Sequence, residues 1–124
     1  MSDAAIEQEI QAKGKTAARV TPADIENNIA SESYFTAADG VRGAIGGESP
    51  VLAEYVTQHG GPLSLLTFCV LTLWNGFTVT GESACASPEN FDAEIGRKIA
   101  RQNAVQKIWP LMGYELRSKL AGEV

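Results

Sequence analysis

The stretch LLTFCVLTLWNGFTVTGESA, residues 65–84, decides the fold of this chain. It contains two runs rich in β-branched and aromatic residues, separated by Asn75-Gly76. This dipeptide is the strongest short-range signal for a β-hairpin, because both of its residues tolerate the positive φ angles of a tight turn. We therefore predict an antiparallel hairpin over residues 65–84.

The register of this hairpin follows from placing Trp74 opposite Phe77. The expected cross-strand pairs are Thr72 with Val79, Leu71 with Thr80, Cys69 with Glu82 and Phe68 with Ser83. Side chains alternate between the two faces of a sheet. One face then carries Phe68, Val70, Trp74, Phe77 and Val79. The other face carries Cys69, Leu71 and Leu73 together with Thr78, Thr80 and Glu82.

The first strand of the hairpin is therefore apolar on both faces, whereas the second strand alternates. A two-stranded sheet is not stable alone. We expect the N-terminal helices or another subunit to cover the second face of the first strand. The same register places Cys69 and Cys85 on opposite sides, which disfavours a disulfide between them. We expect both cysteines to be small, buried hydrophobic residues.

Three Ser/Thr-Pro steps predict helix starts elsewhere in the chain, because the hydroxyl can cap a helix and proline fits its first position. They predict helices over residues 22–30, 50–58 and 88 to about 108. Pro110 is expected to end or kink the last of these helices, before a short segment over residues 111–120.

The longest predicted helix has two apolar stripes. Large residues share one side, namely Phe91, Ile95, Ile99, Val105 and Trp109. Small residues gather on the other side, namely Ala93, Gly96, Ala100 and Ala104. Such a helix can pack on the hairpin with one stripe and on a close neighbour with the other. The predicted fold is therefore α+β, with the hairpin packed on a long C-terminal helix and short helices at the N-terminus.

The remaining segments are predicted to contain little regular structure. A helix over residues 4–12 is polar and too short to be stable alone. We expect residues 1–20 to be a mobile tail and residues 21–124 to form a single domain. Residues 31–49 are predicted to form a long flexible loop. Four glycines support this prediction, namely Gly40, Gly43, Gly46 and Gly47.

The composition excludes several classes of protein. The chain has 124 residues and a net charge of −5, and an acidic chain repels phosphate backbones, so nucleic-acid binding is disfavoured. Its hydrophobic runs are too short for a membrane-spanning helix, and its N-terminus lacks the pattern of a secretory signal. Two cysteines and the single histidine, His59, are too few for a zinc site. We expect a cytoplasmic protein without a metal or cofactor.

Enzyme motifs are absent from the sequence. The run over residues 40–47 is not the G-x-G-x-x-G of a dinucleotide site, and it lacks the Lys-Ser/Thr pair of a phosphate loop. Ser83 lies in Gly-Glu-Ser-Ala-Cys, which lacks the second glycine of a nucleophile elbow. His59 is placed to cap the carbonyls at a helix C-terminus. We therefore expect a protein that is not an enzyme.

One constellation of polar side chains forms a candidate ligand site. The residues of this predicted site are Thr78, Thr80, Glu82, Asn90, Arg97, Lys98, Arg101 and, as a stacking lid, Tyr34. Strand hydroxyls beside arginine and lysine suit an anionic small molecule, because arginine gives bidentate contacts to phosphate and carboxylate. The simpler interpretation is a solvated helix face in which Glu94 and Lys98 form an i,i+4 pair.

Three segments of the sequence resemble a family of small tailed-phage proteins. The segments are Asn75-Gly-Phe-Thr-Val-Thr-Gly-Glu-Ser-Ala84, Asn90-Phe-Asp-Ala-Glu-Ile-Gly-Arg-Lys-Ile-Ala100, and Ile108-Trp-Pro-Leu111 with Gly113-Tyr114. The family is named after gene products forty-nine and sixty-six of two coliphage-like viruses, and it has no assigned activity. The resemblance is close over residues 65–120 and extends to residues 21–35. It implies a phage or prophage protein that acts in the host bacterial cytoplasm, but it transfers no catalytic residues.

Two functions fit these observations. The first is a non-enzymatic accessory protein that counters host defence by binding and sequestering a small nucleotide-type signalling molecule, as a homo-oligomer with a preformed pocket. The alternative is an adaptor or inhibitor that binds a host protein through the apolar hairpin and the acidic N-terminal half. Nucleic-acid binding through Arg97, Lys98 and Arg101 is the weakest hypothesis, given the overall acidity.

Overall fold

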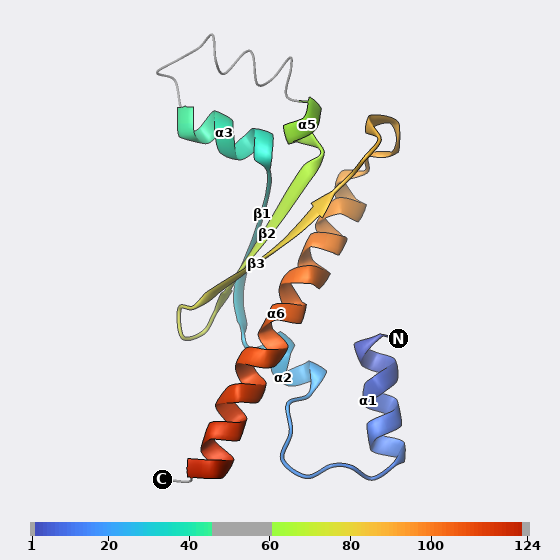
Figure 1. The fold of residues 1–124 in the computed structure, drawn as a ribbon, viewed down its shortest axis with the longest axis vertical. Coiled ribbons are helices and arrows are strands. Elements are labelled where there is room, and N and C mark those ends of the chain that lie inside the picture. Colours follow the sequence, from blue (N-terminus) through green and yellow to red (C-terminus); the bar gives the residue numbers. More distant parts are fainter. Residues whose placement is uncertain (1, 46–60, 123–124) are drawn as a thin grey trace.

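The computed structural model describes residues 2–45 and 61–122 (Figure 1). In chain order its elements are α1 (Asp3–Ala12), α2 (Pro22–Asn27), β1 (Ile29–Thr36), α3 (Ala37–Ile45), α5 (Gly61–Ser64), β2 (Leu66–Leu73), β3 (Thr78–Ala84), the 3-10 turn η2 (Pro88–Asn90) and α6 (Ala93–Gly122). The predicted helix over residues 50–58, His59, and Gly46 and Gly47 of the glycine-rich segment lie outside the described residues.

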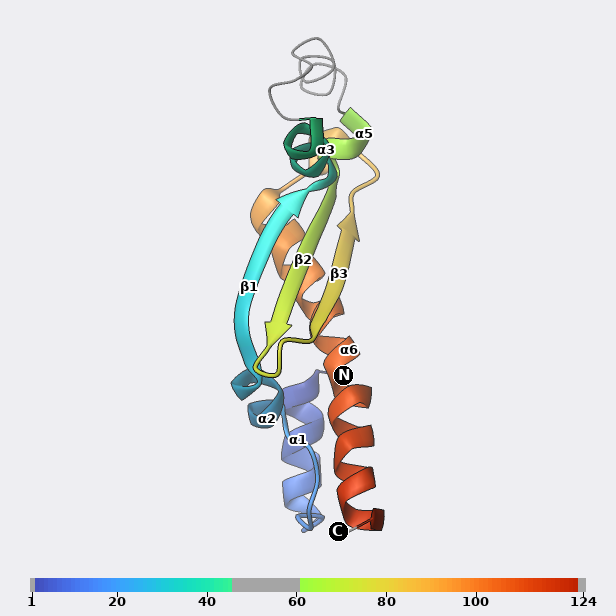
Figure 2. The same ribbon diagram turned by 90° about the vertical axis from the view of Figure 1, so that its left-hand side faces the viewer.

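The sheet has three antiparallel strands in the order β1-β2-β3, and α6 runs diagonally across one of its faces (Figures 1 and 2). The predicted α+β fold, with the hairpin packed on a long C-terminal helix and short helices at the N-terminus, is confirmed. The central strand is β2, which pairs with β1 and β3 along its two edges. Helix α6 covers one face of β2, whereas Phe68 and Val70 on the other face are partly exposed.

The prediction of a flexible loop over residues 31–49 is wrong over the described part of that segment. Residues 29–36 form β1, which pairs along the whole of β2, and residues 37–45 form α3. β1 is stabilised by backbone hydrogen bonds to the edge of β2, and this pairing cannot be predicted from the sequence of β1 alone. The start of α3 did carry a signal, since Asp39 N donates to Thr36 Oγ1 and Thr36 N donates to Asp39 Oδ2, a reciprocal capping box.

The hairpin forms as predicted, but its register differs by one residue. Leu71 pairs with Val79 and Cys69 with Gly81, where Thr80 and Glu82 were expected. The turn is longer than a two-residue loop, since Leu73 N donates to Phe77 O at 2.8 Å. Gly76 is the residue with positive φ, at 89°. A three-residue loop closed by a glycine in this conformation shifts the second strand by one position.

This shift moves the side chains of β3 to the opposite faces from those predicted. Val79 and Gly81 now face α6 together with Cys69 and Leu71 of β2. Thr78, Thr80 and Glu82 share the other face with Phe68 and Val70. Phe35 of β1 stacks on Phe68 on that face, with ring centroids 5.4 Å apart. In Figure 2 this face is turned toward the viewer, with α6 behind the sheet.

The core lies between the sheet and α6. Its buried members are Ile25, Cys69, Leu71, Leu73, Val79, Ala100, Ala104, Val105 and Ile108. The small stripe of α6 is the one that packs on the sheet, whereas Ile95 and Ile99 of the large stripe are 55% and 42% exposed. Small side chains let the helix approach the strands closely, which decides between the two stripes. Both cysteines are free thiols, with Cys69 buried and Cys85 partly buried.

Two predicted helices have different bounds in the structure. The first ends at Asn27, three residues early, because Ile29 enters the sheet. Thr21 and Asp24 form a capping box at its start. The Ser87-Pro88 step opens only η2, and α6 begins at residue 93 with Asp92 Oδ1 accepting from Ile95 N. Pro110 lies inside α6, which continues to residue 122, so the helix does not end at this proline as one of the two predicted alternatives had it.

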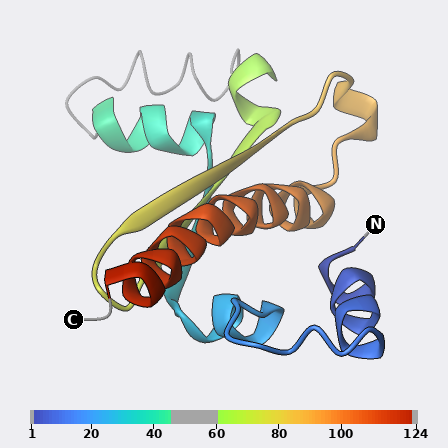
Figure 3. The same cartoon turned by 60° about the horizontal axis from the view of Figure 1, so that its bottom comes forward.

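The N-terminal segment contains the predicted short helix, α1. It lies apart from the C-terminal end of α6 and contributes no buried residue to the protein (Figures 1 and 3). Asp3 accepts hydrogen bonds from Trp109 and Gln106 of α6, and Glu7 pairs with Arg19 through two contacts of 2.6 Å. The expected mobility of residues 1–20 stays a prediction. No helix within residues 2–45 or 61–122 is long and apolar enough to cross a membrane.

Candidate functional site

The three β3 residues of the predicted ligand site, Thr78, Thr80 and Glu82, lie on the face of the sheet that α6 does not cover. Thr80 Oγ1 lies 3.3 Å from Glu82 Oε1, and Lys107 reaches around the edge of β3 to within 3.5 Å of the same hydroxyl. The carbonyl of Glu82 accepts from Asn103 of α6 at 2.8 Å. Within one chain, the strand hydroxyls and the arginines of α6 are therefore separated by the sheet.

The remaining polar residues after the hairpin are dispersed along η2 and α6. Asn90 is exposed in η2. Lys98 forms an ion pair with Glu94 at 3.3 Å, with both side chains more than 70% exposed. This is the i,i+4 pair of the simpler interpretation, and such exposed pairs contribute little to stability.

Arg101 is held by carboxylates of two other elements. Its guanidinium donates to Glu26 of α2 at 2.8 and 3.1 Å and to Glu32 of β1 at 3.1 Å. Glu32 also accepts from the Tyr34 hydroxyl at 2.7 Å, and this hydrogen bond, assisted by Arg101, lowers the pKa of Glu32. Burial, with the bond to Glu32, raises the pKa of Tyr34. These contacts tie α6 to α2 and β1, so Arg101 has a structural role in the described chain.

Tyr34 and Arg97 are two of the predicted site residues, and they line one hollow. This hollow has a volume of about 130 Å³. It is lined by Tyr34, Phe35, Thr36, Asp39, Thr67, Phe91, Ala93 and Arg97. Three aromatic residues, Tyr34, Phe35 and Phe91, lie in it together with the cation Arg97. This combination suits a ligand that has an aromatic ring and an attached anionic group.

The charges of this hollow leave Arg97 available. Asp39, the acid of the hollow, is paired with Arg42, and the hydrogen bonds from Thr36 and then Arg42 keep its pKa below the usual range. Arg97 itself is exposed and forms no ion pair with any residue that the structure describes. An exposed guanidinium without a carboxylate partner can accept an anion without breaking an existing contact.

Lys98 and Arg101 line a different hollow, of about 330 Å³, on the side of α6 that faces α1. Its other lining residues are Ser2, Asp3, Gln102, Val105 and Gln106. Because both cations of this hollow are already paired with glutamates, it offers less to an anion than the hollow beside Arg97.

Four residues at these positions were not predicted from the sequence, namely Glu26, Glu32, Phe35 as a member of a strand, and Phe91 as part of a hollow. Residues 29–36 show no regular alternation of apolar and polar side chains, so the sequence carried no clear signal for β1. Nothing in the sequence connects Glu26 to Arg101, which lies 75 positions away. Among the described residues, no group of three or more His, Cys, Asp or Glu side chains could hold a metal ion.

The fold and these hollows define a small α+β protein whose three-stranded sheet packs on a single long helix, with a cation-bearing aromatic hollow beside it. A comparison with models of known protein families shows which family the chain belongs to. The Phage protein (N4 Gp49/phage Sf6 gene 66) family matches residues 20–120, and the chain belongs to that family. The comparisons with curated proteins and with solved structures found no match.

Proposed function

We propose that this phage protein is a non-enzymatic accessory protein that binds and sequesters a small nucleotide-type anion in the host cytoplasm, and so counters a host defence signal. The observation that supports this proposal is the hollow where Arg97, which forms no ion pair within residues 2–45 and 61–122, lies beside Tyr34, Phe35 and Phe91. Aromatic side chains can stack on any nucleotide base, and arginine binds phosphate through two parallel hydrogen bonds. Sequestration requires binding only.

The size of the hollow favours an oligomer as the binding form. At about 130 Å³ it is smaller than the roughly 300–1,000 Å³ of most ligand pockets. One chain can therefore hold a part of a nucleotide, such as its base or one phosphate. We propose that a second copy of the chain completes the site.

Isothermal titration calorimetry with ADP-ribose, together with native mass spectrometry for stoichiometry, tests the proposal. We expect binding by the wild type and at least about a tenfold loss in Arg97→Ala, because one charge-assisted contact is removed. Arg117→Ala is the matched control, since Arg117 is an exposed arginine on the same helix that does not line the hollow. Equal affinities of the two variants would place the ligand elsewhere.

A second candidate function, binding of a host protein, is favoured by one end of the molecule. Four large side chains are exposed around the hairpin turn and the C-terminal half of α6: Trp74 (71%), Phe77 (56%), Leu111 (40%) and Tyr114 (78%). Exposed aromatic residues of this kind anchor protein interfaces. Two hollows between the turn and α6 share Asn28, Asn75, Met112 and Glu115.

Pull-down from host lysate with matched variants tests this second function. Phe77→Ser with Tyr114→Ser should remove a specifically bound host protein, because both anchors are lost. Ile95→Ser should retain it, since Ile95 is equally exposed but lies near the other end of α6. A bound protein that all variants retain would argue against this surface.

A further inference from the structure

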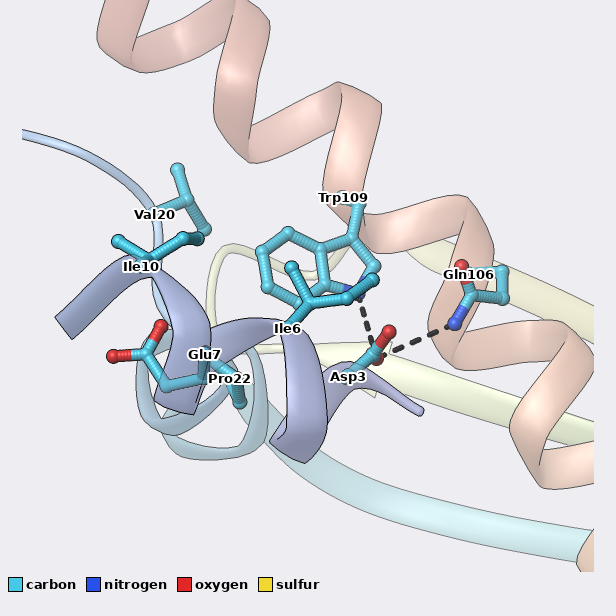
Figure 4. A pocket seen from close by; sticks show the side chains of 8 residues that line it. All are labelled: Asp3, Ile6, Glu7, Ile10, Val20, Pro22, Gln106 and Trp109. Atoms are coloured by element: carbon cyan, nitrogen blue, oxygen red, sulfur yellow. Dashed lines mark hydrogen bonds between the residues drawn. The ribbon is translucent and has the colours of Figure 1, made fainter. Parts of the chain in front are cut away.

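A further pocket, separate from the hollows described above, lies between α1 and α6 (Figure 4). Its volume is about 210 Å³. Its lining residues are Asp3, Ile6, Glu7, Ile10, Val20, Pro22, Gln106 and Trp109. In Figure 4 the Trp109 ring forms one wall, the side chains of Ile6 and Ile10 reach toward it from α1, and Asp3 lies at the edge of the ring. The pocket is thus an apolar space with a carboxylate at its rim.

The carboxylate of Asp3 is held at the rim of the pocket by two side chains of α6. It accepts hydrogen bonds from Trp109 Nε1 at 3.1 Å and Gln106 Nε2 at 3.3 Å, and both donors are neutral. Glu7, the other acid of the pocket, is neutralised by its bidentate pair with Arg19. The pocket therefore carries one negative charge that no cation among its lining residues balances.

Two further cations, in the hollow next to this pocket, do not change that balance. Lys98 and Arg101 line the adjoining hollow, which shares Asp3 and Gln106 with the pocket. Lys98 is paired with Glu94, and Arg101 is paired with Glu26 and Glu32. A positively charged ligand is consequently favoured at Asp3.

We propose that this pocket binds an alkylammonium group. The volume corresponds to about seven water-sized groups at roughly 30 Å³ each, which suits a short aliphatic chain with a terminal nitrogen. Methylene groups would lie against Ile6, Ile10 and Val20. The ammonium would lie between Asp3 and the face of Trp109, where a carboxylate and a cation–π contact act together. The group could belong to a free aliphatic amine or to a lysine side chain of another protein.

The test follows the indole N–H cross-peak of Trp109 in a ¹H–¹⁵N NMR spectrum of the full chain. This N–H donates to Asp3 and so reports directly on the proposed contact. The spectrum of Trp74→Phe assigns the peak. Titration with n-hexylamine, 1-hexanol and hexanoate at fixed pH and ionic strength should rank the amine first, by about tenfold over the alcohol, and hexanoate last. Equal affinity for amine and alcohol would overturn the proposal.

Three variants separate charge from volume. Asp3→Asn keeps an oxygen acceptor for Trp109 but removes the charge, so it should weaken hexylamine about tenfold and leave hexanol unchanged. Glu9→Gln removes the same charge from the same helix outside the pocket and should change neither affinity by more than about twofold. Ile10→Phe fills the pocket and should abolish binding of both probes. Loss of hexylamine binding in Glu9→Gln as large as in Asp3→Asn would overturn the proposal.

A last pair of probes identifies the source of the group. Nα-acetyl-lysine N-methylamide that binds as well as hexylamine would assign the pocket to a lysine side chain of a partner protein. Binding of hexylamine alone would assign it to a free amine, and binding of neither would overturn the proposal. Arg97→Ala should leave hexylamine binding unchanged, so failure here is distinct from failure of the nucleotide proposal.

Discussion

Gly81 shows how one residue position sets the distance between the sheet and α6. A Cβ atom added there would lie 2.1 Å from the carbonyl oxygen of Ala100 and 2.3 Å from the amide nitrogen of Ala104. Both atoms belong to the helix backbone, which cannot move without displacing the whole of α6. The requirement for glycine at this position therefore comes from close helix–strand packing, since its φ angle is ordinary.

We predict that Gly81→Ala lowers the free energy of unfolding by about 3 kcal/mol or more, as expected for overpacking against backbone. Gly113→Ala is the matched control, because Gly113 lies inside α6 with open space around it and alanine is the better helix former. It should raise the stability by about 0.5–1 kcal/mol. Urea denaturation measures both values. Similar stabilities of the two variants would contradict the close packing of β3 on α6.

Glu7 carries the largest shift of an acid in the described chain. Its hydrogen bonds from Arg19 and then Gln11 lower its pKa from 4.5 to about 2. A carboxyl group with a lowered folded-state pKa stabilises the folded state fully above its unfolded value. We therefore expect this contribution to be present above pH 4.5 and to be lost as the pH falls toward 2.

The test is an NMR titration of the Glu7 side-chain carboxyl carbon. Arg19→Gln should raise the pKa of Glu7 toward 4.5, because it removes the hydrogen-bond donor that lowers this pKa most. Lys13→Gln should leave it unchanged, since Lys13 pairs with Glu9 instead. A pKa of Glu7 that is the same in Arg19→Gln and in the wild type would show that the bidentate pair does not form in solution.

At the scale of the elements, Arg97 and Arg101 of α6 have different roles. Arg101 has a structural role, whereas Arg97 is available to bind a ligand. Arg101 joins α6 to α2 and β1 through Glu26 and Glu32, whereas Arg97 contacts neither. Removal of Arg101 is therefore expected to cost stability, whereas removal of Arg97 is not.

We predict that Arg101→Ala lowers the free energy of unfolding by about 1–2 kcal/mol, because a hydrogen-bonded network of three elements is broken. Arg97→Ala and Lys98→Ala should each change it by less than about 0.5 kcal/mol, as usual for exposed side chains. Thermal and urea denaturation of the three variants make the comparison. An Arg101→Ala variant as stable as the wild type would remove the structural role given to Arg101.

The elements also show which features of the fold could be predicted from sequence patterns and which could not. The Asn75-Gly76 turn between two apolar runs was sufficient to place the hairpin. The Thr21-Pro22 step placed the start of α2, and the two apolar stripes predicted the long C-terminal helix. The register was not predictable, because Asn-Gly serves both two-residue and three-residue loops, and the choice reverses every side chain of β3. β1 was missed because an edge strand with one polar face depends on its neighbour for its structure.

At the scale of the whole molecule, α1 is the part attached most weakly. It has no buried residue, it lies outside the range matched by the family, and its hydrogen bonds to α6 come from one residue, Asp3. The core, by contrast, is shared by α2, β2, β3 and α6. Low burial and few tertiary contacts are the features of segments that open locally.

We predict from this difference that the amides of α1 exchange with deuterium at least about a hundredfold faster than those of residues 100–108 of α6, where exchange requires global unfolding. Hydrogen–deuterium exchange of the full chain measures both rates. Equal protection of the two helices would show that α1 is an integral part of the cooperative unit and would contradict the expectation of a mobile N-terminal tail.

The sequence by itself determined the class of fold, the hairpin, the long C-terminal helix and the absence of enzyme motifs, because these depend on local patterns of turn residues, helix caps and apolar spacing. It also proposed eight ligand residues, and binding by any of them stays a prediction. Only the tertiary structure decided which of the eight meet, since Tyr34 and Arg97 share a hollow while Thr78 and Thr80 lie across the sheet from α6. It also decided that Arg101 is held by two glutamates, because contacts between residues 75 positions apart depend on how the elements pack.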